Sequence, residues 1–256
     1  MTDRVLAIGK NTFREAVRGK LFAAIGVFGV ILMGSSAIVG PLSLGEQARI
    51  VQDLGLAGMS VLGFMVAVLI GTGIVFTEVE RRTIYTVIAK PVERWQFILG
   101  KFAGLNATIF VLVVGMTVIL LGAAWIEIGY FKPQLLQAVL LTWVELMVLT
   151  SLSILMSVVC SPILGAIFTF LLYIIGHTSG DLRELAQHFG SGSAKTVTNV
   201  AYYILPNLEY FNIRSKVIHS VHVDSAYIIF ACVYGLFYCV VFLTIAGAIF
   251  ERKEFK

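Results

Sequence analysis

Two titratable side chains lie inside long stretches that otherwise lack charge, Glu145 and His177. A carboxylate at membrane depth is energetically costly and usually faces a protein interior or water. Glu145 could therefore be a group of a substrate pathway, or a proton-linked group. It could equally be a protonated acid that is hydrogen-bonded to a neighbouring span, which is the interpretation we favour. His177 falls at the end of its stretch.

Other chemistry-bearing patterns are sparse. His219 and His222 could be two metal ligands on one helical face, but no third partner accompanies them, so no metal site is expected. The Gly-Lys pairs lack the rest of a phosphate-binding loop. The motifs of metalloproteases, dithiol redox enzymes and serine hydrolases do not occur either. The sequence therefore predicts a chain that is not itself an enzyme.

The composition indicates where this chain resides. Hydrophobic residues make up 58% and charged residues 13%, with a mean hydropathy of +0.91. A soluble domain has about 45–50% apolar and about 25% charged residues, which are needed to cover its surface. The apolar runs do not alternate as barrel strands would. An all-α, polytopic membrane protein is predicted, with lipid around it.

The long apolar runs predict six spans, because a helix needs about 20 residues to cross the hydrocarbon core. Proline cannot continue a helix, so the 48 residues between Lys132 and Asp181 are divided at Ser161-Pro162. The first run is too long for the core of a signal peptide, and an uncleaved span is expected there. The predicted spans are 21–40, 54–77, 102–126, 135–159, 162–177 and 225–250.

The basic residues set the orientation. Most of the 19 Lys and Arg residues lie in segments 1–20, 78–101 and 251–256, which an even number of spans puts on one side. Lys and Arg are enriched in cytoplasmic loops, so both termini are predicted to be cytoplasmic. The net charge of +4 thus reflects topology, and no basic soluble face indicates nucleic acid.

Segment 1–20 has a helical, amphipathic pattern that suits a helix lying in the membrane interface. The alternative is a plain positive flank of the first span. The apolar side holds Leu6, Phe13, Ala16 and Val17, and the polar side holds Asn11, Arg14, Glu15 and Arg18.

Segment 78–101 mixes charges with apolar residues. The spacing predicts two short helices that meet at Lys90-Pro91, because the residue before proline disfavours helical geometry. Exposed apolar residues on such a segment suit a protein partner. The alternative is an ordinary solvated, positive loop.

Two further patterns concern packing and the outer side. Gly100 and Gly104, like Ala231 and Gly235, are small residues four apart that allow helices to approach closely. The outer connection 178–224 contains an aromatic stretch broken by Pro206, which predicts a surface-lying or re-entrant element or simply a loop anchor.

One segment carries a family resemblance. Glu80-Arg-Arg-Thr-Ile84, then Ala-Lys-Pro-Val-x-Arg-x-x-Phe-Ile-Leu-Gly-Lys ending at Lys101, follows the second of the six spans. This arrangement resembles the permease subunits of ABC type 2 transporters. It is most similar to the small bacterial six-span branch that includes gliding-motility and nitrous-oxide-reductase maturation permeases. The resemblance covers the whole chain.

The resemblance implies that segment 78–101 is a coupling helix that docks on a cytoplasmic ATPase. The N-terminal helix and the turn between the fourth and fifth spans would be further contacts. The implied contact residues are Glu80, Arg81, Arg82, Thr83, Tyr85, Lys90, Arg94, Arg14, Arg18 and Ser161. The implied outer cap of the substrate path consists of Pro206, Asn207 and Phe211. The second span has one face with polar residues, Thr72 and Thr77. Together with Glu145 they are the candidate residues of the substrate pathway.

The expected function is that of the membrane subunit of an ABC exporter in the bacterial inner membrane. A separate ATPase subunit would hold ATP and Mg²⁺, and this chain would bind no cofactor. A second permease copy is expected as a homodimer partner, and an accessory periplasmic protein is a further candidate partner. The alternative is a membrane anchor that transmits ATP-driven force to a periplasmic protein without moving a solute.

Overall fold

The computed structural model describes residues 2–17, 22–39, 46–80, 94–128, 132–189 and 205–252. Within these ranges all regular elements are helical, which confirms the predicted all-α class. The long helices are α1 (Thr2–Ala16), α2 (Phe22–Val39), α3 (Gln47–Glu80), α5 (Arg94–Ile128), α6 (Gln134–Val159), α7 (Pro162–Phe189) and α10 (Ser225–Arg252). The 3₁₀ helix η3 (Leu208–Phe211) and the short α9 (Arg214–Ile218) precede α10.

Five described helices are long and apolar enough to cross a membrane, namely α3, α5, α6, α7 and α10. The chain is thus a polytopic membrane protein. The first predicted span, 21–40, corresponds to α2, whose apolar part with described side chains is the shorter stretch Ala23–Ser35. The count of six spans stays a prediction.

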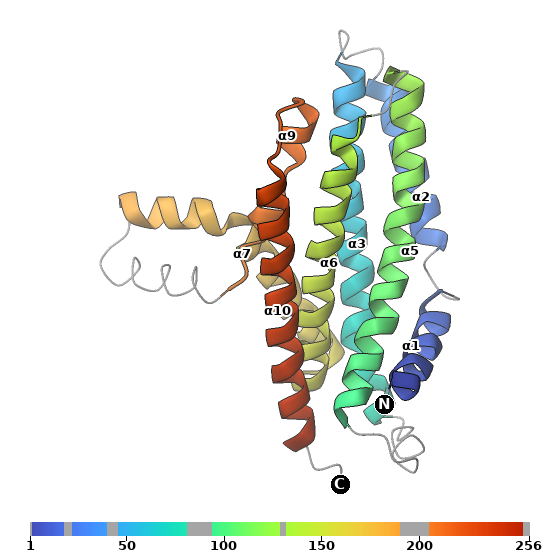
Figure 1. Ribbon diagram of the computed structural model, residues 1–256, viewed down its shortest axis with the longest axis vertical. Helices are drawn as coiled ribbons and strands as arrows, with labels where there is room; N and C mark the ends of the chain where they lie inside the picture. The colour runs from blue at the N-terminus through green and yellow to red at the C-terminus, as the bar shows by residue number, and fades with distance from the viewer. Residues whose placement is uncertain are drawn as a thin grey trace.

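The helices form an elongated bundle around α6 (Figure 1). Helices α3, α5, α7 and α10 all pack against α6, and most α6 residues are buried. Helix α1 and the end of α10 at Arg252 lie at one end of the bundle, here called the terminal end. The opposite end, where α3 and α6 begin and α9 lies, is called the distal end.

The break between α6 and α7 has a local cause. Helix α6 ends at Val159 because Cys160 adopts an extended backbone, with φ −121° and ψ 170°. Pro162 then occupies the start of α7. Proline is tolerated there because the first N–H groups of a helix have no partner within the helix. The chain thereby turns back along the bundle after a very short connection.

Several helices extend beyond the predicted spans. Helix α3 continues to Glu80 and α5 begins at Arg94, so both ends of segment 78–101 belong to long helices. The prediction of a separate short helix after Pro91 is wrong for residues 94–101, because they continue directly into the span. Lys101, for example, is only 2% exposed within the bundle. Likewise, α7 extends to Phe189, into the predicted outer loop 178–224. Charged residues mark where a helix leaves lipid, but they do not end its hydrogen-bond ladder.

Helix α1 packs on α5 with most of the predicted face, and Gly9 and Thr12 also take part in the contact. Ala16 is buried and Phe13 and Val17 are half-buried, as predicted, while the polar side at Asn11, Arg14 and Glu15 is exposed. The prediction is wrong for Leu6, which is 67% exposed, and it leaves out Thr12, which is buried. The contact forms where glycines lie on both helices. A Cβ added to Gly104 would lie 2.5 Å from the carbonyl oxygen of Gly9 and 2.7 Å from Cβ of Thr12. The face of α1 is therefore selected by small residues and close backbone approach, not by hydrophobicity alone.

The predicted close approaches at small residues are confirmed at both places. At Gly100 a Cβ would lie 2.7 Å from Cβ of Ile8 on α1. At Gly235 on α10 it would lie 2.5 Å from Cγ1 of Val144 on α6. Small residues thus let α1 rest on α5 and α10 rest on α6 at backbone distance.

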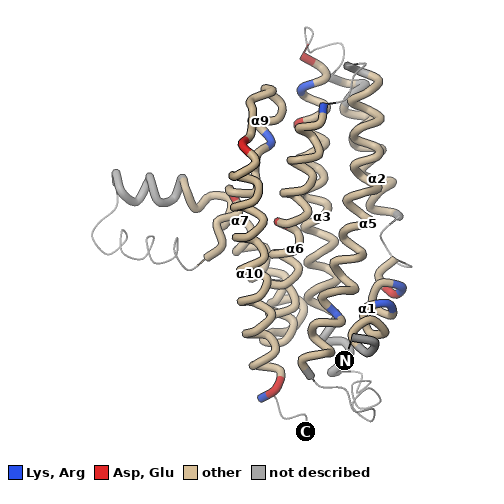
Figure 2. The backbone as a smooth tube through the Cα atoms, in the orientation of Figure 1, with Lys and Arg blue, Asp and Glu red and all other residues tan. Residues whose placement is uncertain are grey.

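Charged residues gather towards the two ends of the bundle, and its long middle is almost free of them (Figure 2). Glu145 on α6 is an exception, because it lies inside the bundle and is only 3% exposed. Its partners define the polar centre of the molecule.

Candidate functional site

Glu145 joins three helices through one carboxylate oxygen. Its Oε1 atom lies 2.9 Å from Nε2 of His177 on α7. The same oxygen accepts a longer hydrogen bond, 3.4 Å, from the hydroxyl of Ser60 on α3. Ser60 is in turn 3.4 Å from the hydroxyl of Tyr173, one helical turn before His177. The carboxyl group is therefore held by polar contacts from α3 and α7.

His177 also links this buried acid to the exposed side of the molecule. Its other ring nitrogen, Nδ1, lies 3.9 Å from Oε2 of Glu209 in η3. The side chain of Glu209 is 51% exposed, whereas that of Glu145 is 3% exposed. An imidazole thus lies between a buried and an accessible carboxylate.

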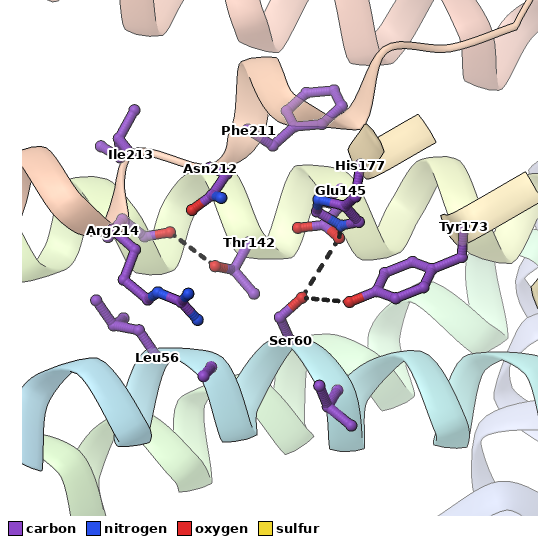
Figure 3. Close-up of a pocket in the computed structure, with 13 residues that line it drawn as sticks. Leu56, Ser60, Thr142, Glu145, Tyr173, His177, Phe211, Asn212, Ile213 and Arg214 are labelled. Carbon is purple, nitrogen blue, oxygen red and sulfur yellow. Dashed lines mark hydrogen bonds and ion pairs between the residues drawn. The ribbon is translucent and has the colours of Figure 1, made fainter. Parts of the chain in front are cut away.

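These side chains line a cavity of about 180 Å³ between α3, α6, α7 and the η3–α9 segment (Figure 3). Its walls combine the polar groups above with apolar and aromatic side chains. The lining residues are Leu56, Ala57, Ser60, Val61, Ala138, Thr142, Glu145, Tyr173, His177, Phe211, Asn212, Ile213 and Arg214. A cavity with a few converging polar groups on a mostly apolar wall is the usual form of a small-ligand site.

Arg214 closes the distal side of this cavity. It begins α9, and its side chain reaches into the space towards α3 (Figure 3). Its Nε atom lies 2.8 Å from Oδ1 of Asp53 on α3. The ion pair therefore ties the segment before α10 to a membrane helix at the edge of the cavity.

The three residues predicted as an outer cap lie beside this cavity. Asn207 accepts a hydrogen bond from the backbone N–H of Glu209 and so caps η3, and its own N–H donates to the Tyr234 hydroxyl. Pro206 is buried, and Phe211 is buried on the cavity wall. Residues 205–213 are thus packed into the distal end of the bundle, against α6, α7 and α10.

The predicted pathway residues do not all come together. Thr72 is buried, and its hydroxyl donates to the carbonyl of Val68 in its own helix. Its methyl group faces Gly165 on α7, so it packs two helices and does not line the cavity around Glu145. The side chain of Thr77 lies outside the described part of the structure.

Most of the predicted ATPase contacts also lie outside the described residues. These are Arg81, Arg82, Thr83, Tyr85, Lys90 and Arg18. Glu80 ends α3 and Arg94 begins α5, and their side chains are likewise not described. Arg14 is exposed on α1, and Ser161 is exposed in the turn between α6 and α7.

Sequence reasoning identified Glu145 but missed its partners. Ser60, Tyr173, Glu209 and Arg214 carried no motif, and His177 was read as a residue at the end of a span. One signal was available, because Tyr173 and His177 are four residues apart and lie on the same face of an apolar helix. The contacts between helices could not be read from spacing along one chain.

The polar groups of the site do not form a metal centre in the part of the chain that the structure describes. Among the described residues, no group of three or more His, Cys, Asp or Glu side chains could hold a metal ion. His219 and His222 are exposed in the turn before α10. The cavity groups can donate and accept hydrogen bonds, exchange protons and bind a ligand by charge.

Fold and cavity together define a polytopic helical membrane protein with a polar site inside an apolar bundle. The sequence model of a family described as "ABC-2 family transporter protein" matches residues 6–255. The chain therefore belongs to this family, and it is a permease of an ABC transporter. Such permeases are typically non-catalytic membrane subunits that partner an ATPase subunit. No curated protein matches the sequence.

Proposed function

We propose that this chain couples ATP hydrolysis on a separate ATPase subunit to export of a substrate across the bacterial inner membrane. ATP and Mg²⁺ would be held by that partner, and this chain would bind no cofactor. Both termini would be cytoplasmic, so that the terminal end of the bundle faces the ATPase and the distal end faces outward.

The observation that carries this proposal is the way α1 is held. Its inner face lies against α5 at Gly100 and Gly104, while Lys10, Arg14 and Glu15 are exposed on it. Figure 2 shows charged positions along α1, which lies on the outside of the bundle towards the terminal end. Helix α1 is thus a rigid, charged surface that a soluble subunit can push or pull, and its contact with α5 transmits the movement.

The chain segment between α3 and α5 supports the same interface. Helix α3 ends and α5 begins at the terminal end, so residues 81–93 connect two long helices there. A movement of this connection acts directly on α3, which carries Ser60 of the cavity, and on α5, which carries α1. We propose Arg81 and Arg82 as its main contacts with the ATPase.

The proposed path of the substrate runs between two copies of the chain. The core around α6 is filled by packed side chains from α3, α5 and α10, so one bundle does not enclose a wide path. A homodimer would place the path between the two bundles. The cavity beside Arg214 reaches the distal end, which is where an exported substrate would leave.

Co-purification with an ATPase tests this function. The chain is expressed with the ATPase subunit encoded beside its gene, and the complex is isolated through a tag on the permease. We expect the ATPase to accompany the wild-type chain and to be lost from the Arg81→Glu, Arg82→Glu double variant. Arg49→Glu is the matched control, because Arg49 is an exposed arginine at the distal end. Failure of the wild-type chain to bring any ATPase would contradict the proposal.

A second function is favoured by the packed segment before α10. Residues 205–224 form an ordered surface at the distal end, with Glu209, Asn212 and Lys216 exposed. Such a surface suits a force transmitter that acts on a periplasmic protein without moving a solute. ATP hydrolysis by the reconstituted complex separates the two functions. Stimulation by a solute inside or outside the vesicles supports export, whereas stimulation only by a periplasmic protein supports force transmission.

A further inference from the structure

The cavity around Glu145 has an unused acceptor on its wall. Among the described residues, the hydrogen bonds of Glu145 all go to Oε1, from His177 and Ser60. The second oxygen, Oε2, accepts no hydrogen bond from the described residues, and Glu145 lines the cavity although its side chain is only 3% exposed. A carboxylate oxygen inside a mostly apolar bundle is energetically costly unless a ligand or water in the cavity supplies a donor.

The charges around the cavity favour a positive ligand. The guanidinium of Arg214 is balanced by Asp53 at 2.8 Å. The other titratable side chains on the cavity wall are Glu145, His177 and Tyr173. Glu209 is not part of the wall, but its Oε2 atom lies 3.9 Å from Nδ1 of His177. With Glu145 and Glu209 both ionised, two carboxylates flank one imidazole, and the balance is negative whether the ring is neutral or protonated. An anion would therefore meet net repulsion, and a cation would meet net attraction.

The size and the walls of the cavity suit an organic cation. An apolar cavity of about 150 Å³ holds a benzene molecule, so about 180 Å³ accommodates a group of a few heavy atoms. Tyr173, Phe211 and His177 supply aromatic walls, and Leu56 and Val61 supply apolar ones. Aromatic faces next to a carboxylate are a recurrent way to bind alkylammonium groups. Asn212, which is exposed, borders the cavity beside Arg214 and offers an entry.

We propose that the cavity between α3, α6, α7 and η3–α9 is a binding site for a small organic cation. The ammonium group lies beside Oε2 of Glu145, and its alkyl groups contact the aromatic and apolar walls. Arg214 stays paired with Asp53 and closes the distal side over the bound ligand. The site belongs to a single chain, so ligand binding requires neither the ATPase nor a second copy.

Binding of choline tests the proposal without any variant. The full chain is purified in lipid nanodiscs, and binding is followed by isothermal titration and by thermal unfolding. Choline is compared with 3,3-dimethylbutan-1-ol, which has the same shape but no charge. Inorganic phosphate is the anionic probe. We expect choline to bind and to raise the unfolding temperature, with at least tenfold weaker binding of the neutral alcohol and no effect of phosphate.

Two variants locate the site. Glu145→Gln keeps the size of the side chain and its hydrogen bonding but removes the charge, and we expect at least tenfold weaker binding of choline. Glu46→Gln removes an exposed carboxylate at the same end of the bundle, outside the cavity, and binding should not change. Should Glu145→Gln fail to fold, Tyr173→Leu removes an aromatic wall and is expected to weaken choline more than the neutral alcohol.

Any result that differs from these expected binding results overturns the proposal. Equal binding of choline and the neutral alcohol would mean an apolar cavity without charge recognition. Binding of phosphate in place of choline would assign the site to Arg214 as an anion site. Absence of choline binding, or unchanged binding in Glu145→Gln, would exclude Glu145 as the cation partner. None of these results depends on the ATPase, so they are distinct from a failure of the proposed export function.

Discussion

At the residue scale, Glu145 determines how three helices meet. Its carboxyl group lies on α6, which is buried at the centre of the bundle, and its partners are Ser60 on α3 and His177 on α7. In lipid, the packing energy of apolar side chains differs little between alternative registers of two neighbouring helices. Polar contacts between helices add this specificity because an unpaired polar group is unfavourable there.

Substitution of Glu145 should therefore destabilise the bundle in proportion to the contacts that are lost. Glu145→Ala removes both hydrogen bonds and leaves His177 without its buried partner, and we expect a loss of about 1–2 kcal/mol. Glu145→Gln retains a side chain that can bond to both partners, so it should lose less than about 1 kcal/mol. Unfolding of the purified chain in mixed micelles by added SDS measures both values. Equal stability of the two variants would show that the carboxyl contacts do not hold the helices.

Glu145 and its partners also show what the sequence could and could not predict at this scale. A single acid in a 48-residue stretch with no other charge is conspicuous, and both a structural and a functional role were open to it. The structure shows hydrogen-bonding partners for Glu145 on neighbouring helices, as its structural role requires. It also shows a cavity beside Glu145, so a functional role stays open. Arg214, in contrast, is one of several basic residues outside the spans, and only the fold brings it to the cavity.

At the element scale, α1 and α5 form the contact through which movement at the terminal end would reach the bundle. The contact depends on Gly100 and Gly104, because any larger side chain would overlap α1. The sequence predicted close approach at these glycines from their spacing. For α1 the hydrophobic pattern predicted the buried Ala16 correctly, but it was wrong for the exposed Leu6 and left out the buried Gly9 and Thr12.

Gly104→Val should separate α1 from α5. The added side chain overlaps the backbone of Gly9 and the side chain of Thr12, and overpacking of this kind costs about 1–3 kcal/mol. Thr12→Cys, in a chain without the three native cysteines, reports the separation by maleimide labelling. Thr12 is buried, so labelling should be slow in the parent and at least tenfold faster with Gly104→Val.

Gly122→Val is the control for this substitution. Gly122 lies on the same helix, and a Cβ there meets no atom within 4 Å. Labelling at position 12 should match the parent in this variant. Fast labelling in both variants would mean that any valine in α5 disturbs α1, and slow labelling in both would mean that Gly104 is not the contact.

The Arg214–Asp53 pair connects two elements, and its contribution can be measured by exchanging the charges. Both side chains are more than a third exposed, so water weakens the pair and we expect a coupling energy of only about 0.2–1 kcal/mol. Asp53→Arg and Arg214→Asp should each destabilise the chain, and the double exchange should recover part of the loss. A double-mutant cycle on SDS unfolding gives the coupling, and strictly additive effects would contradict it.

At the scale of the whole molecule, the placement of charge indicates how the chain works. The middle of the bundle is almost free of charge, the terminal end carries the charged face of α1, and the distal end carries the Arg214–Asp53 pair (Figure 2). The all-α class and the approximate positions of the five long apolar helices followed from hydropathy, because lipid requires long apolar helices. The ends of the helices could not be predicted from hydropathy. A helix can continue in water beyond the membrane until a residue departs from helical backbone geometry.

Photo-crosslinking is the most direct test of the central claim, that the ATPase docks at the terminal end and drives the bundle. A photoreactive phenylalanine analogue is placed at Arg14, on the exposed face of α1, or at Lys216, which is exposed at the distal end. The account predicts that, in intact cells, the ATPase subunit is captured from position 14 and not from position 216. Capture from position 216 alone, or from neither position in cells that produce both subunits, would contradict it.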